Sequence, residues 1–293
     1  MKFISWNLNL APVMYDRYNR KKLILKQMNK LVNYNVICFQ ELNSWNIGVF
    51  GYLFYKYFGE IVGTYFPFLM IILDIIFIME GMIFNFYCYN NMKEFDEFFE
   101  DNGYQVVASH SDKYVSSGLF IAVKGYYNIT SIQDYKLSSD IIHSPGLLYI
   151  KMRTIDNEEF GIYNLHLVPS LPNTTIIYKL VNLLNRIFRK KPNSIRLENY
   201  SKINNIIKIN EDKQIFMLGD FNEKMNTAQY NFMMNLFNIN NIKSIKFDDN
   251  VTNTCLEENV IIDYIFTNLN YDTMVTTKKD LIFSDHYAIE TII

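Results

Sequence analysis

The sequence has few cysteines, few histidines and almost no net charge. Its 293 residues include four histidines and three cysteines, Cys38, Cys88 and Cys255. An odd number of cysteines without metal-site spacing argues against a disulfide framework and indicates free thiols in a reducing compartment. Lysine and arginine total 28 against 30 aspartate and glutamate residues, a formal net charge of −2. Because proteins that bind the nucleic-acid backbone usually carry a positive surplus, that function would need a local basic patch.

The sequence also lacks a recognisable signal peptide and a linker. Its first residues, MKFISWNLNL, do not have the charged, apolar and small-residue regions of a signal peptide and already have the pattern of a strand. We therefore expect a cytoplasmic protein. No internal repeat and no Gly-, Ser- or Pro-rich linker divides the chain. We expect one domain over 1–293, with insertions at about 46–92 and 168–195.

Short apolar runs of strand length recur along the chain, and segments with helical spacing separate some of them. The runs are rich in β-branched and aromatic residues, and most are bounded by Gly, Asn, Asp or Ser, as strands are. The expected strands are 2–8, 35–42, 117–125, 147–154, 160–167, 214–221, 261–268 and 286–293. The expected helices are 19–33, 93–102, 195–210 and 227–238. This mixture predicts a layered α/β or α+β domain.

Polar residues of a particular kind stand at or near the ends of these expected strands. In an α/β sheet, residues just beyond strand ends gather at one edge, where ligand sites form. Carboxylates and carboxamides with few thiolates suit a hard cation such as Mg²⁺ or Mn²⁺. Each residue alone is also explained as a strand end or an Asx turn, so the prediction of a site depends on the whole set. The set comprises Asn7, Glu41, Asn164, His166, Asp220, Asn222, Asp263, Asp285 and His286.

The order of these motifs resembles a known superfamily. The succession SWNLN, CFQEL, SGLFIAVK, YNLHL, LGDFNE, IDYIF and SDHYAIE is similar to that of the endonuclease/exonuclease/phosphatase superfamily, from residue 3 onward and outside the two insertions. The resemblance implies a two-sheet α/β sandwich of the deoxyribonuclease I-like type and a metal-dependent phosphoesterase activity. Within the superfamily, SSGLFIAVKG followed by HSPGLLYIKM and YNLHL looks most like the neutral sphingomyelinase branch.

The resemblance also implies a metal site and a phosphate contact. It implies Glu41 as the principal Mg²⁺ ligand, with Asn7 beside it and Asp285 near the metal. It implies that His166 contacts the phosphate or assists the leaving group, supported by Asn164. The chemistry requires such parts independently, because a phosphodiester needs its charge neutralised and a metal ion is the strongest local device for doing so.

The remaining residues of the set are implied to act on the attacking water. His286 would be the general base or a phosphate-binding histidine, held by Asp263. Asp220 would help to activate or orient the water, with Asn222 beside it. A histidine backed by a carboxylate suits the need for a proton acceptor whose pKa lies near the working pH. Tyr114 is a candidate for the tyrosine that contacts substrate in some relatives.

Residues 65–84, YFPFLMIILDIIFIMEGMIF, form a strongly apolar stretch inside the first insertion. The charge-free run Ile61–Leu73 is shorter than the roughly 20 apolar residues that a helical membrane span needs. Asp74 and then Glu80 interrupt the apolar residues that follow, and an acidic residue at the centre of a bilayer is costly. Taken alone, the stretch resembles a membrane span that two acidic residues make unfavourable.

A helix over 68–86 would place Asp74, Gly81 and Asn85 on one narrow stripe and leave the rest of its surface almost entirely apolar. Such a helix must be hidden in protein or in lipid. We expect it to enter or lie on a membrane, because the sandwich supplies its own core. The alternative is a helical hairpin packed on the domain or in an oligomer. A single crossing is excluded if the resemblance holds, since it would separate Glu41 from the rest of the site.

The second insertion has helical apolar spacing over 174–196 and a basic end. An amphipathic helix with a basic end suits an anionic membrane surface, and a surface helix with a solvated end explains it equally well. The same cluster is the candidate nucleic-acid contact of the chain. Its residues are Arg186, Arg189, Lys190, Lys191 and Arg196.

The sequence therefore predicts a phosphodiesterase that uses Mg²⁺ (or Mn²⁺) and activated water to hydrolyse a membrane phospholipid, as a sphingomyelinase does. We expect peripheral or monotopic association with a phospholipid membrane, and we predict no protein partner. One alternative is an endonuclease, exonuclease or nucleic-acid phosphodiesterase with the same site. A second alternative is a non-catalytic membrane-binding protein of the same fold.

Overall fold

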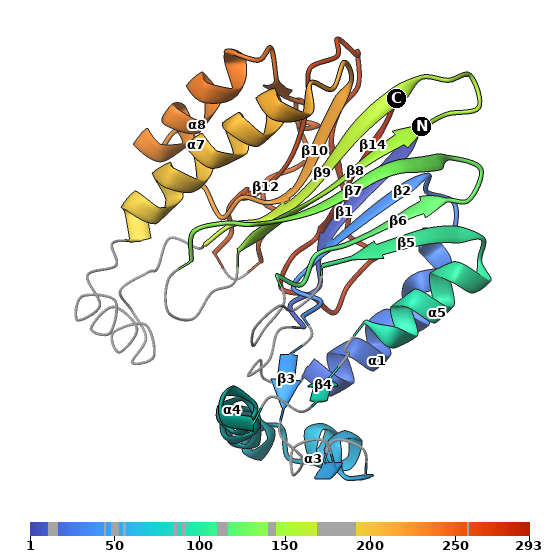
Figure 1. The fold of residues 1–293 in the computed structure, drawn as a ribbon, viewed down its shortest axis with the longest axis vertical. Helices are drawn as coiled ribbons and strands as arrows, with labels where there is room; N and C mark the ends of the chain where they lie inside the picture. Colours follow the sequence, from blue (N-terminus) through green and yellow to red (C-terminus); the bar gives the residue numbers. More distant parts are fainter. Residues whose placement is uncertain are drawn as a thin grey trace.

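Two six-stranded sheets face each other at the centre of the molecule (Figure 1). The computed structural model describes residues 1–10, 17–43, 45–47, 53–54, 57–84, 87–89, 92–109, 117–139, 145–168, 192–256 and 258–293. The first sheet has the order β13 (Thr276–Lys278), β14 (Ala288–Ile292), β1 (Lys2–Asn7), β2 (Val36–Gln40), β6 (Phe120–Lys124), β5 (Tyr104–Ala108). The second has the order β11 (Lys243–Ser244), β12 (Asp263–Thr267), β10 (Ile215–Asp220), β9 (Glu159–His166), β8 (Gly146–Arg153), β7 (Asn128–Lys136).

Helices cover the outer faces of both sheets, which gives four layers (Figure 1). On the first sheet lie α1 (Arg17–Gln27), the short 3₁₀ helix η1 (Met28–Leu31) and α5 (Lys93–Asp101). On the second lie α7 (Pro192–Asn210) and α8 (Ala228–Asn238). Each of the four helices and eight strands expected from the apolar patterns is present in the structure.

The alternation of side chains along the strands divides the apolar residues among three cores. In β1, Phe3 faces the second sheet and Ile4 faces the helices, since successive strand residues point to opposite faces. In β2, Cys38 and Phe39 divide in the same way. Because both faces of these strands are covered, apolar side chains occupy both faces: β2 is apolar from Val36 to Phe39, and only Ser5 interrupts Phe3–Trp6 in β1.

The strands that the sequence did not predict have weaker patterns. β7 is half-buried or exposed along its length and carries Thr130, Gln133 and Asp134 among its residues, so it lacks an apolar run. It lies at the edge of the second sheet, where one of its sides pairs with no strand of the described residues. β5 is only five residues long, and β11 and β13 have two and three.

The first insertion lies beyond the end of the sandwich at which β1 and β2 finish (Figure 1). It contains β3 (Trp45–Ile47), α3 (Gly59–Tyr65), α4 (Pro67–Phe84) and β4 (Tyr87–Tyr89), and β3 pairs with β4. Most of the apolar stretch, Pro67–Phe84, forms the single helix α4, and Tyr65 ends α3. In the described part of the chain, no helix has both the length and the apolar character needed to cross a membrane.

α3 is attached to the N-terminal part of α1. Asn19 donates its side-chain amide to the Thr64 carbonyl at 3.3 Å. A Cβ placed on Gly63 would lie 2.1 Å from the ring of Tyr18, so glycine is what permits the two helices to approach this closely. The insertion is thus connected to the sandwich through a helix that itself packs on the first sheet.

Part of the predicted second insertion lies outside the described residues. Residues 169–191 lie outside the described residues, and this interval includes Arg186, Arg189, Lys190 and Lys191. Tyr114 also lies outside the described residues.

Candidate active site

Strand register brings the predicted residues to one end of the two sheets. Asn7 ends β1 opposite Gln40, the last residue of β2, and Glu41 follows directly. In the second sheet, Asp220 at the end of β10 pairs with His166 on one side and with Asp263 on the other. These pairings place residues that are far apart in sequence at one end of the sandwich, the end at which the parallel strands finish.

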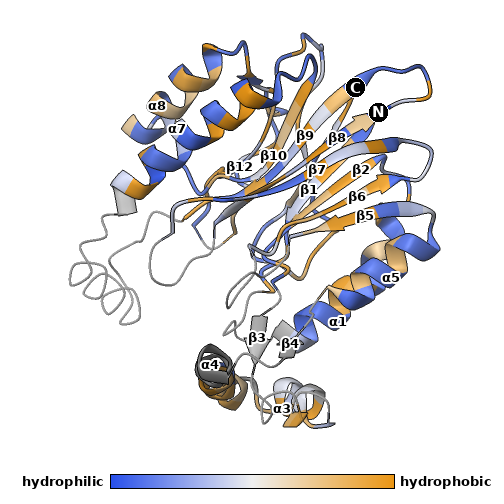
Figure 2. Ribbon diagram, viewed as in Figure 1, coloured by the Kyte–Doolittle hydropathy of each residue, from blue (hydrophilic) through white to orange (hydrophobic). Residues whose placement is uncertain are grey.

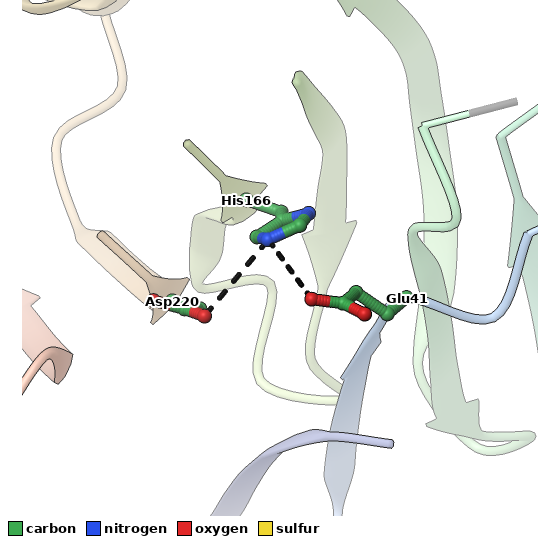
Figure 3. Close-up of side chains that lie close together, drawn as sticks. All are labelled: Glu41, His166 and Asp220. Carbon is green, nitrogen blue, oxygen red and sulfur yellow. Dashed lines mark ion pairs between the residues drawn. The ribbon is translucent and has the colours of Figure 1, made fainter. Parts of the chain in front are cut away.

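Three side chains converge from β2, β9 and β10 (Figure 3). His166 Nε2 lies 3.4 Å from Glu41 Oε1 and 3.9 Å from Asp220 Oδ2. Ligand atoms of all three residues lie within 4.8 Å of one another. Asp220 also belongs to a second such group, with Asp263 and His286, so the two groups share one carboxylate.

Asn7 hydrogen-bonds to the carboxylates of both Glu41 and Asp220. Its amide nitrogen donates to Glu41 Oε1 at 3.1 Å and to Asp220 Oδ2 at 2.9 Å, and its oxygen accepts from the backbone N–H of Asn9 at 3.0 Å. The opposite amide orientation would place the oxygen against two carboxylates and the NH₂ against an N–H, so the network defines this one. In this arrangement Asn7 orients Glu41 and Asp220, and its oxygen faces the backbone instead of the cluster.

His286 is held on the other side of Asp220. Its Nδ1 lies 2.9 Å from Asp263 Oδ2, and its Nε2 lies 3.8 Å from Asp220 Oδ2. Trp6 donates its indole N–H to the His286 carbonyl at 3.1 Å. Because Asp263 binds one ring nitrogen, the other is directed at Asp220, which is the arrangement of a positioned acid–base histidine.

Burial and neighbouring charges alter both titrating groups. Burial, and then the negative charge of Asp263, raise the pKa of Asp220 to about 6, although His286, His166 and the Asn7 hydrogen bond act to lower it. Burial alone lowers the pKa of His286, but Asp263, Cys255 and Asp220 outweigh it and raise the pKa well above its ordinary value. A buried carboxylate and a charged histidine in contact are typical of functional sites.

The donor set fits a hard divalent cation. Glu41 and Asp220 direct carboxylate oxygens into one space, with His166 at its rim. Asp220 is 1% exposed, so its negative charge has little solvent to screen it. Carboxylate oxygens in such a space are what Mg²⁺ or Mn²⁺ binds, and no thiolate is present in either described group.

The structure places Asn164 between the sheets. From β9 it donates to the carbonyls of Phe39 at 2.8 Å and Phe120 at 3.0 Å, which belong to the first sheet. Its oxygen accepts from the Gln40 side chain at 2.7 Å, and Gln40 also donates to Ser5. The amide is therefore committed to a bridge between the sheets, and it supports His166 and Glu41 by setting the distance between their strands.

Asp285 lies outside the two groups of potential ligands, and the Asn222 amide binds a backbone carbonyl. Asn222 donates its amide to the Leu167 carbonyl at 2.8 Å, and its backbone N–H donates to Asp220 Oδ1 at 2.7 Å. It thus connects the chain after β9 to the chain after β10. Asp285 borders a cavity of about 320 Å³ together with Arg20 and Ser284.

Several supporting residues were missed by the sequence analysis. Ser284 donates to the Asn7 carbonyl at 2.6 Å and accepts from the His286 N–H at 3.1 Å. It thus connects the N-terminal strand β1 to the C-terminal segment that carries His286. The second contact is a serine turn, which the spacing Ser-Asp-His could have indicated. Thr254 accepts from the N–H of Asp263 at 3.1 Å, and no local pattern signals that contact.

The backbone at the site is strained. Glu41, Asn222 and Asn9 have positive φ angles of 56°, 50° and 50°, and Phe283 has one of 92°. Asparagine tolerates this region, but glutamate and phenylalanine rarely adopt it. Such strain persists only where the surroundings impose it, and it gathers at functional sites.

Comparisons with known proteins agree on the fold. No protein-family model and no curated protein sequence matches the chain. Among solved structures, an endonuclease/exonuclease/phosphatase family protein from Bacteroides thetaiotaomicron is 13% identical, with 99% of this chain and 96% of that chain covered and a TM-score of 0.60. A double mutant of Staphylococcus aureus beta toxin with bound magnesium ions is 15% identical, with 99% and 98% covered and a TM-score of 0.61.

A third similar structure is a mannosyl-6-phosphatase from Bacteroides thetaiotaomicron. It is 14% identical, with 100% of this chain and 98% of that chain covered and a TM-score of 0.56. These likenesses extend over nearly the whole length of each protein. The chain therefore has the two-sheet α/β sandwich of the deoxyribonuclease I-like fold, the fold of the superfamily that its sequence motifs resemble.

Proposed function

We propose that the chain is a divalent-metal-dependent phosphoester hydrolase. The observation that carries this proposal is the convergence of Glu41, His166, Asp220, Asp263 and His286 at one end of the sandwich. A structural role alone does not explain three carboxylates and two histidines gathered there at the ends of separate strands. The donor set suits a cation, and the cation would neutralise charge on the phosphoryl oxygens.

The residues on the two sides of Asp220 have different roles in the proposed reaction. A water molecule beside Asp220 would lose its proton to the Asp220 carboxylate while its oxygen forms a bond to phosphorus, and the charged His286 would stabilise the negative charge that develops. The bond from phosphorus to the leaving oxygen breaks, and His166 supplies the proton that this oxygen requires. Glu41 and Asp220 would hold the metal, and Asn7 keeps their carboxylates in position. Asp263 fixes the orientation of the His286 ring.

We further propose that the substrate is the phosphodiester of a membrane phospholipid. The sequence motifs most resemble the neutral sphingomyelinase branch, and the similar beta-toxin structure contains magnesium ions. The apolar helices α3 and α4 lie at the same end of the sandwich as the site, which supports a substrate that is presented at a lipid surface (Figure 2). The membrane contact itself is argued in the next subsection.

The test is hydrolysis of sphingomyelin and phosphatidylcholine in vesicles, with Mg²⁺, with Mn²⁺ and with EDTA. We expect metal-dependent release of a phosphorylated head group. Glu41→Gln and His286→Asn should each lower the rate by roughly a hundredfold or more. The matched control is Glu158→Gln, which changes an exposed carboxylate in the loop between β8 and β9, at the opposite end of β9 from His166.

Two outcomes would overturn parts of this proposal. Cleavage of DNA or RNA without cleavage of any lipid would replace the lipid substrate with the nucleic-acid alternative. No turnover of any phosphoester would favour a non-catalytic protein of the same fold. Of the basic cluster predicted to contact nucleic acid, Arg196 alone lies within the described residues, and it is 2% exposed with its guanidinium paired with Glu223.

A further inference from the structure

The insertion carries an exposed apolar surface. Every exposed side chain described between 57 and 77 is aliphatic or aromatic. Ten of the 24 large hydrophobic side chains exposed in the described part of the chain lie in this interval. We call these ten side chains the α3–α4 face. The other exposed hydrophobic side chains are distributed over the rest of the sequence, which is normal for a protein surface, whereas a large concentration indicates a binding site.

α4 has two unlike sides. Met70, Asp74 and Phe77 are buried, at a spacing of four and three residues that places them on one stripe. The opposite stripe includes Phe68, 70% exposed, and Ile72, 44% exposed. Asp74, the residue that interrupted the apolar run in the sequence, therefore faces the protein and leaves the outer side of the helix without a described charge.

The composition of the α3–α4 face distinguishes a lipid partner from a protein partner. Protein interfaces have polar rims and about one hydrogen bond per 100–200 Å², but in the described part of this face the only polar side-chain atoms are tyrosine hydroxyls. Tyr57 and Tyr65 are 61% and 74% exposed. Tyrosine, with an apolar ring and a polar tip, is enriched at the boundary between lipid and water.

The position of the face supports the same partner. α3 and α4 lie beyond the end of the sandwich where Glu41 follows β2 (Figure 1). α3 is attached to α1 through Asn19, and Arg20 of α1 donates to the Asn9 carbonyl at 2.9 Å, two residues beyond Asn7. The face is thus mechanically connected to the strand end that carries the site.

We propose that the α3–α4 face docks on a lipid bilayer and lies in its interfacial region, with the end of the sandwich that holds the site turned toward the head groups. An apolar helix face buries itself at the boundary between head groups and acyl chains without crossing the bilayer. The choice of a lipid surface rests in part on the proposed function, since the phosphodiester of a lipid lies at the depth of the head groups. Binding does not require catalysis, so the two proposals are tested separately.

The test is flotation of the full chain with phosphatidylcholine–sphingomyelin vesicles in EDTA, which prevents metal-dependent turnover. The triple variant Phe68→Gln, Ile72→Gln, Ile75→Gln, which we call the α4 variant, changes side chains that are 70%, 44% and 48% exposed, so the fold should be retained. We expect the vesicle-bound fraction of the wild-type chain to exceed that of the variant by roughly tenfold or more, because three apolar side chains are withdrawn from lipid.

A second triple variant provides the matched control. Ile155→Gln, Ile209→Gln and Ile239→Gln also replace three apolar side chains with glutamine, at residues that are 77%, 76% and 67% exposed elsewhere on the surface. This variant should float as the wild type does. Equal flotation of the wild type and the α4 variant overturns the proposal. It is also overturned if the wild-type chain does not bind vesicles and instead forms a dimer, and the α4 variant does not form that dimer.

Turnover of a soluble phosphodiester distinguishes the two proposals. Bis(p-nitrophenyl) phosphate with Mg²⁺ measures the site without a membrane. The α4 variant should retain the wild-type rate on this compound while its rate on vesicles falls by roughly tenfold or more, in proportion to the lost binding. A wild-type chain that floats but hydrolyses neither substrate contradicts the proposed function and leaves the docking surface supported. A variant that floats normally contradicts docking whatever its rates.

Discussion

Asn7 connects two carboxylates of the site, those of Glu41 and Asp220. Its amide donates to Glu41 and to Asp220, each of which would otherwise face a like charge across a buried space. A hydrogen bond from a neutral amide to an ionised oxygen stabilises the charged form without adding charge. The same side chain is only 1% exposed, so water cannot replace it.

Asn7→Asp tests this role directly. The substitution preserves shape and adds a carboxylate next to Glu41 and Asp220, so we expect the free energy of unfolding in EDTA to fall by about 2 kcal/mol or more. Mg²⁺ should recover part of the loss, because a cation screens the added repulsion. Urea unfolding with and without the metal measures both effects. Asn157→Asp, at an exposed turn with φ of 61°, is the control. Unchanged stability of Asn7→Asp in EDTA would contradict the bridging role.

At the scale of elements, α7 holds the loop that follows β10. Arg196 of α7 donates to the Asn222 carbonyl at 2.9 Å and forms an ion pair with Glu223. Glu223 also accepts from the hydroxyls of Tyr200 at 2.8 Å and Thr227 at 2.6 Å. The charges are 2% and 3% exposed, so this is a buried pair that fixes the residues immediately after Asp220.

Removing one charge of the pair should lower the free energy of unfolding more than removing both charges. Arg196→Met leaves Glu223 as an uncompensated buried charge, and we expect it to lower the free energy of unfolding by about 3–5 kcal/mol. Adding Glu223→Gln to Arg196→Met should restore part of the stability. A double-mutant cycle by chemical denaturation measures the coupling. Additive effects of the two changes would show that the groups do not interact as a pair.

The sequence predicted those elements whose patterns are local. Apolar runs that end in Asn7, Glu41 or Asp220 predicted both the strands and the site, because a polar residue directly after a buried apolar strand indicates a strand end with a possible function. The bridge made by Asn164 was not predictable, because it depends on which strand of the other sheet faces β9. The same is true of the pair between Arg196 and Glu223, which are 27 residues apart in sequence. Arg196 has the local pattern of a solvated basic end, and tertiary packing buries it.

The molecule as a whole should be stabilised by the metal that its site fits. Binding to the folded chain alone adds about 2.7 kcal/mol when the metal is present at a hundred times its dissociation constant. For a chain of this size we expect Mg²⁺ or Mn²⁺ to raise Tm by roughly 5 °C relative to EDTA. Glu41→Gln should remove most of this shift and Glu158→Gln should retain it. Equal Tm values with metal and with EDTA would contradict the metal site.

The order of strands in the first sheet has a consequence for how the protein is made. β1 lies between β2 and β14, and its pairing with β14 joins Lys2 to Ile292. During synthesis β1 can pair with β2 early, but its other edge stays open until nearly the whole sequence has been translated. Contacts at such separation form slowly, and an open edge invites wrong pairing. Because Asn7 and His286 come from these two regions, we expect the proposed active site to form in a nascent chain only once β14 is in place.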